Sequence, residues 1–126
     1  MNTQIQDAYI VAATRTPVAK RNGMFRTVRP DDMLAHVLAA VVTKVPGLDA
    51  TEIADVIVGC AMPEAEQGMN VARIGLLLAG LPNTVPGITI NRFCSSGLQA
   101  VADAAARIRL GEAEVMIAAG TESMSV

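Results

Sequence analysis

The chain has 126 residues, of which 52% are hydrophobic, 17% are charged and 2% are aromatic, so its core must be aliphatic. The formal net charge of -2 provides no basic surface for nucleic acid. No apolar run is long enough for a membrane-spanning helix, and the N-terminus lacks the features of a signal peptide. We therefore expect one cytoplasmic domain that binds neither nucleic acid nor membranes.

The first half of the chain predicts two strands with a helix between them. A short apolar run at residues 9–14 predicts a buried strand. Pro30, followed by two aspartates, opens a helix whose apolar residues recur at helical spacing until Pro46. A continuous apolar run at residues 55–60 then predicts a second buried strand.

The second half continues the alternation of helices and strands. It predicts helices over residues 71–79 and 97–110, and strands over residues 88–90 and 115–119. Continuous apolar strands joined by helices are typical of a mainly parallel sheet with right-handed crossovers. The predicted fold class is therefore α/β, with four strands.

The predicted helix over residues 97–110 is apolar on most of its circumference. Its apolar positions are Leu98, Ala100, Val101, Ala102, Ala104, Ala105, Ala106 and Ile108. Such a helix is expected to be buried on most sides. One four-stranded sheet covers only one side, so we expect a second layer from further sequence or from a partner subunit.

Cys94 is the candidate nucleophile. It lies where a predicted strand ends and a predicted helix begins, at or near the helix N-terminus. The first amide N–H groups of a helix have no partner within the helix, and their aligned dipoles act as a partial positive charge. This setting favours the thiolate, and the same amides can bind a thioester oxygen as it becomes an oxyanion.

A structural role is the alternative for this cysteine, because a free cysteine is usually a small buried hydrophobe. The local pattern leaves both interpretations of Cys94 open. Cys60 ends a predicted strand among valine and alanine residues, which favours a structural role. With only two cysteines the sequence predicts no disulfide framework, and we expect two free thiols.

Other candidate side chains are weaker. His36 is the only histidine and lies in the middle of a predicted helix, so a role as catalytic base depends on whether it reaches Cys94. Glu64 and Glu66 could form a carboxylate pair, but a solvated acidic loop is the simpler interpretation. The sequence contains no metal-ligand spacing and no glycine-rich phosphate loop.

A series of short motifs runs the length of the chain. The most specific is Asn91-Arg92-Phe93-Cys94-Ser95-Ser96-Gly97-Leu98-Gln99-Ala100, and others in the same register lie at residues 13–17, 23–25, 55–59, 67–73, 79–82 and 111–125. The motif around Cys94 resembles the active-site cysteine signature of thiolases. The ordered series makes the whole chain similar to the N-terminal portion of that family.

The resemblance implies a thiolase fold, in which two similar halves stack as alternating helix and sheet layers. Residues 1–126 would form a truncated N-terminal βαβαβαβ half with a buried catalytic helix. By resemblance, Cys94 attacks a 3-ketoacyl-CoA, releases acetyl-CoA and passes the shortened acyl chain to coenzyme A. The reverse reaction condenses two acetyl-CoA molecules. Acyl-CoA and coenzyme A are then substrates, no cofactor is expected, and members are homodimers or homotetramers.

Several parts of the thiolase active site have no counterpart in the chain. The family's activating histidine, its second, acid/base cysteine and much of its coenzyme A site lie in the C-terminal half. We therefore expect the chain alone to be inactive and its function to be that of the complete enzyme. Two alternatives remain: a condensing enzyme that uses acyl carrier protein, and a non-enzymatic half-domain that acts in assembly.

Overall fold

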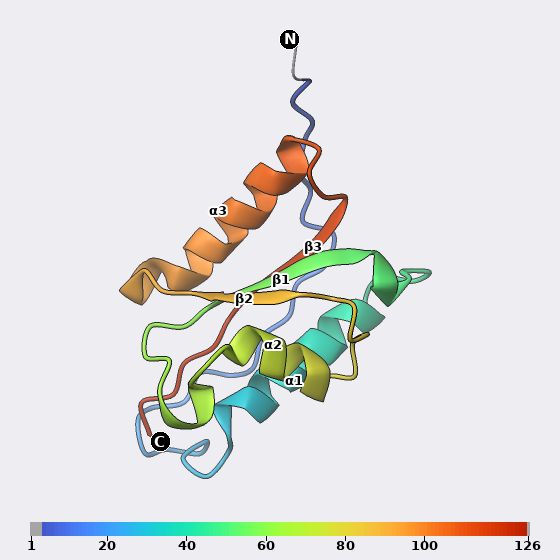
Figure 1. Cartoon of the computed structure of the whole chain (residues 1–126). Helices are drawn as coiled ribbons and strands as arrows, with labels where there is room; N and C mark the ends of the chain where they lie inside the picture. Colours follow the sequence, from blue (N-terminus) through green and yellow to red (C-terminus); the bar gives the residue numbers. More distant parts are fainter. Residues whose placement is uncertain (1–3, 126) are drawn as a thin grey trace.

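A three-stranded parallel sheet forms the middle layer of the molecule. The computed structural model describes residues 4–125 and orders the strands β2-β1-β3. Their bounds are β1 (Ile53–Gly59), β2 (Gly87–Ile90) and β3 (Val115–Gly120). Helices α1 (Pro30–Thr43) and α2 (Val71–Leu78) cover one face, and α3 (Ser96–Arg109) covers the other (Figure 1).

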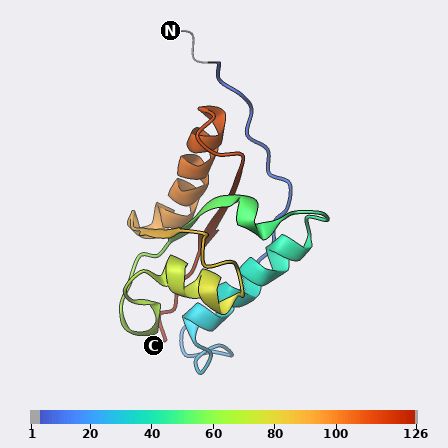
Figure 2. The same ribbon diagram turned by 45° about the vertical axis from the view of Figure 1, so that its right-hand side comes forward.

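The central strand β1 is apolar along its length because both of its faces are covered. Val56 and Val58 are fully buried against α1 and α2, whereas Ile57 packs with Ala100 and Ala104 of α3. The view in Figure 2 shows α3 separated from the other two helices by the sheet. The prediction of an α/β fold with a parallel sheet is confirmed.

Six of the predicted helices and strands are present, with ends within about two residues of the expected positions. Three short 3-10 helices join them, at Ala50–Glu52, Ala65–Gln67 and Phe93–Ser95. In the part of the chain that the structure describes, no helix combines the length and the apolar character needed to cross a membrane.

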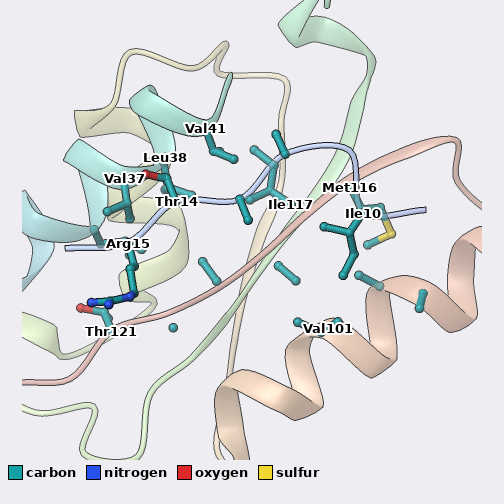
Figure 3. Close-up of a pocket in the computed structure, with 18 of the residues that line it drawn as sticks. Ile10, Thr14, Arg15, Val37, Leu38, Val41, Val101, Met116, Ile117 and Thr121 are labelled. Atoms are coloured by element: carbon teal, nitrogen blue, oxygen red, sulfur yellow. The ribbon is translucent and has the colours of Figure 1, made fainter. Parts of the chain in front are cut away.

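The predicted strand over residues 9–14 is wrong. The segment is not paired with the sheet, and Tyr9 and Ile10 are 76% and 81% exposed. A cavity of about 540 Å³ is lined by this segment together with residues of β3, α1 and α3 (Figure 3). The segment is not close enough to β3 for the spacing of about 4.8 Å between paired strands, and the sheet has three strands instead of four.

Helix α3 is buried on one face only, which differs from the expectation of burial on most sides. Ala100 is fully buried against the sheet, whereas Leu98 is 74% exposed and Val101 is 39% exposed. The reason is the layering, because α1 and α2 lie on the opposite face of the sheet (Figure 2). Within residues 4–125 no element covers the outer side of α3.

Candidate active site at the carboxyl edge of the sheet

Strands β1 and β3 both end in glycine where α3 begins. A Cβ atom on Gly59 would lie 2.3 Å from the carbonyl carbon of Ser96, so only glycine lets the first turn of α3 rest on the backbone of β1. The amide of Thr121 donates to the carbonyl oxygen of Gly59 at 3.0 Å and ties the two strand ends together. In open α/β sheets this carboxyl edge is where ligands bind.

Cys94 lies on this edge and is exposed. It is the middle residue of the 3-10 turn Phe93–Ser95, and α3 begins two residues later, at Ser96. The amide of Ser96 donates to the carbonyl of Phe93, so the turn and α3 form one continuous helical segment with Cys94 at its N-terminal end. The predicted position of Cys94 near a helix N-terminus is confirmed.

Two side chains hold the turn in shape. The hydroxyl of Ser96, a residue that is 4% exposed, accepts from the amide of Arg92 at 2.8 Å and donates to the carbonyl of Phe93 at 2.7 Å. Asn91 Oδ1 accepts from the amide of Phe93 at 2.9 Å. Phe93 has a φ of 50°, a left-handed conformation that is rare for a bulky residue. Strained backbone therefore lies next to Cys94.

A polar cluster connects the loops at the same edge. The side-chain amide of Gln67, which is 2% exposed, donates to the Glu122 carboxylate at 2.7 Å and to the Met62 carbonyl at 2.6 Å. Glu122 also accepts from the amide of Ala61 at 2.8 Å. We did not predict roles for Gln67, Asn91 or Glu122. The usable signal was that Asn91 and Glu122 closely follow β2 and β3 at one edge.

The remaining predicted candidates are not brought to Cys94. His36 is exposed on α1 and lines a second pocket, beside Arg15 and Phe25, that does not include Cys94. Glu64 is exposed in its loop and Glu66 is half-buried. Across residues 4–125, no group of three or more His, Cys, Asp or Glu side chains could hold a metal ion.

Cys60 directly follows β1 and is 1% exposed, in agreement with the predicted structural role. Burial raises the pKa of this thiol, and the nearby Glu122 carboxylate raises the pKa further, because both disfavour the thiolate. Cys60 is therefore held as a neutral thiol in the core.

We expect Cys60 to make the fold sensitive to alkaline pH. Above about pH 8.5 the unfolded chain releases this thiol proton, whereas the folded chain retains it, so the unfolded state binds fewer protons and stability falls as pH rises. Urea unfolding measured from pH 7 to pH 10 should show a loss of stability that is smaller in Cys60→Ala. Equal pH dependence in the two proteins would contradict this expectation.

Fold and site together describe an α/β domain that presents an exposed thiol where a turn leads into a helix. Residues 8–126 match the family model described as "Thiolase, N-terminal domain". The chain belongs to the thiolase family, which confirms the resemblance drawn from its motifs.

Known thiolases match almost the whole chain. It is 52% identical over 122 residues to the 3-ketoacyl-CoA thiolase of Bacillus subtilis, covering 96% of this chain and 31% of the relative. It is 47% identical over 120 residues to the beta-ketoadipyl-CoA thiolase of Pseudomonas knackmussii, covering 95% and 30%. The crystal structure of the Bacillus anthracis acetyl-CoA acetyltransferase superposes with a TM-score of 0.91 at 38% identity, covering 98% and 31%. The chain thus spans less than a third of the length of these relatives.

Proposed function

We propose that this chain supplies the nucleophile of a thiolase-type acyltransferase and that Cys94 carries the acyl group. The observation that carries the proposal is the position of Cys94. In a chain of the thiolase family, this thiol is exposed on the turn that leads into α3, at the carboxyl edge of the sheet. Its neighbour Cys60 is buried and is unsuited to attack a substrate.

The proposed chemistry has two steps. The Cys94 thiolate attacks the 3-keto carbon of a 3-ketoacyl-CoA, and the oxygen gains charge that free amides at the N-terminal end of this helical segment can stabilise. The bond between C2 and C3 then breaks, the acetyl-CoA carbanion takes up a proton, and the acyl group stays on sulfur as a thioester. The thiol of coenzyme A attacks this thioester in the second step and regenerates Cys94.

We further propose that the chain needs a C-terminal part for turnover. Proton transfer to and from the reacting groups requires an acid and a base within hydrogen-bond reach. The only imidazole of the chain, His36, lies on α1 and lines a pocket that does not include Cys94. By resemblance, a histidine and a second cysteine of the C-terminal half complete the site, in a cytoplasmic homodimer or homotetramer.

A chimera tests the proposal. Residues 1–126 replace the matching N-terminal part of the Bacillus subtilis 3-ketoacyl-CoA thiolase, and cleavage of acetoacetyl-CoA by coenzyme A is followed by absorbance. We expect turnover by the chimera and none by the 126-residue chain alone. Acyl transfer from acyl carrier protein but not from coenzyme A would indicate a condensing enzyme instead. A folded chimera that transfers no acyl group would overturn the proposal.

A further inference from the structure

We propose that Asn91 is a positioning residue for Cys94 and that Glu122 anchors Asn91 through the backbone of Ala61. The inference rests on the proposed function, since it assigns a role to residues that surround the proposed nucleophile. Neither Asn91 nor Glu122 needs to touch the substrate in this role. Both act on the shape of the turn that presents the thiol.

Asn91 links the turn to the end of the central strand. Its Nδ2 donates to the carbonyl oxygen of Ala61 at 3.1 Å, and its Oδ1 accepts from the amide of Phe93 at 2.9 Å. Ala61 follows β1 by two residues, and Phe93 immediately precedes Cys94. One side chain therefore fixes the residue before the thiol relative to the sheet.

Glu122 also holds the backbone of Ala61. Its Oε2 accepts from the amide of Ala61 at 2.8 Å, so Ala61 is held through its N–H by Glu122 and through its C=O by Asn91. The other carboxylate oxygen, Oε1, accepts from the buried Gln67 side chain at 2.7 Å. The side-chain oxygen of Gln67 in turn accepts from the amide of Ser123 at 2.8 Å. We call this set of hydrogen bonds from Gln67, Asn91 and Glu122 the clamp. It joins the loops that follow β1, β2 and β3.

The clamp restrains a strained backbone conformation at Phe93. Phe93 is 73% exposed, so packing of its ring does not explain its left-handed φ of 50°. A strained conformation persists only where its surroundings impose it. The hydrogen bond from the Phe93 amide to Asn91 imposes it from the N-terminal side. Ser96 holds the turn from the C-terminal side through its bonds to Arg92 and Phe93. Loss of the Asn91 bond removes the restraint on the N-terminal side, and we expect the turn to relax and Cys94 to move relative to the start of α3.

The test compares Asn91→Ala with a matched control in the 126-residue chain. Asn70 also makes two side-chain hydrogen bonds, to Gly87 at 2.9 Å and to Thr89 at 2.8 Å, but it does not contact Ala61 or the turn. Alkylation of Cys94 by iodoacetamide at neutral pH is followed by peptide mass spectrometry. The buried Cys60 reports whether each variant stays folded, because it should label slowly in every folded chain.

We expect Asn91→Ala to slow alkylation of Cys94 at least about threefold and Asn70→Ala to leave it unchanged. Asn91→Ser should recover part of the rate, because a serine hydroxyl can accept from the amide two residues on, although both Asn91 variants lose the bond to Ala61. Glu122→Gln should slow labelling by less than Asn91→Ala. If Asn91→Ala unfolds, the serine and Glu122 variants carry the test. Unchanged labelling in these variants, or equal slowing by Asn70→Ala, would overturn the proposal.

The chimera separates this proposal from the proposed function. There, Asn91→Ala should lower kcat by about 10- to 100-fold with little change in KM, because misplacement affects the reacting atoms and not substrate binding. An inactive chimera whose Cys94 labelling still depends on Asn91 would refute the function and support the positioning role. An active chimera in which Asn91→Ala changes neither kcat nor labelling would refute the positioning role alone.

Discussion

Cys94→Ala is expected to lower kcat of the chimera for acetoacetyl-CoA cleavage by at least about 10³-fold. Alanine cannot form the acyl-thioester, so the reaction would lose its covalent intermediate while the fold is kept. Cys94 is exposed, and its removal therefore leaves no cavity in the core. Turnover is measured by absorbance, and circular dichroism confirms that the variant is folded.

Cys60→Ala is the matched control, because it removes the other thiol of the chain, which is buried directly after Gly59. It should lower the free energy of unfolding, since Cys60 is 1% exposed, but it should leave kcat within a few-fold of the parent chimera. If Cys94→Ala kept kcat within about tenfold, or if only Cys60→Ala abolished turnover, Cys94 would not be the nucleophile.

Gly59→Ala is expected to destabilise the fold by at least about 2 kcal/mol. The added Cβ would lie 2.3 Å from the carbonyl carbon and 2.5 Å from the carbonyl oxygen of Ser96. These are backbone atoms of the first turn of α3, so no side-chain rotation can relieve the overlap. The helix would have to move away from β1, and Cys94 would move with it. Urea unfolding of the 126-residue chain measures the effect.

Gly97→Ala is expected to have the opposite effect. Gly97 follows Ser96, the residue that the added Cβ of Gly59→Ala would overlap. A Cβ at Gly97 meets no atom within 4 Å, and the residue lies in the helix with an ordinary φ. Alanine there should leave stability unchanged or raise it by up to about 1 kcal/mol, because it reduces the freedom of the unfolded chain. A destabilisation of Gly97→Ala equal to that of Gly59→Ala would mean that the contact with β1 is not the cause.

The paired strands were predictable because local sequence determines them. β1 is a continuous apolar run that ends in glycine. Such a run is typical of a strand with both faces covered, which does not alternate apolar and polar residues. Residues 9–14 show the same kind of run. Whether such a run joins the sheet depends on where the rest of the fold places it, which no local pattern encodes. The prediction failed at this non-local step.

The site divides in the same way. The position of Cys94 follows from the end of β2 and the start of α3, which both lie within a few residues of it. The positions of Asn91 and Glu122 just after β2 and β3 place them at one edge of the sheet, but the hydrogen bonds of the clamp could not be predicted, because they join three loops that meet only in the folded chain. The left-handed φ of Phe93 could not be predicted either, because an aromatic residue type does not favour this conformation.

The most direct test of Cys94 as the acyl carrier is to look for the acyl group itself. The chimera is mixed with acetyl-CoA, quenched in acid and digested, and its peptides are examined by mass spectrometry. We predict one acetyl group on the peptide that contains Cys94, lost when coenzyme A is added before the quench and absent in Cys94→Ala. Continued turnover with no acetyl group on Cys94, or an acetyl group that persists in Cys94→Ala, would contradict the account.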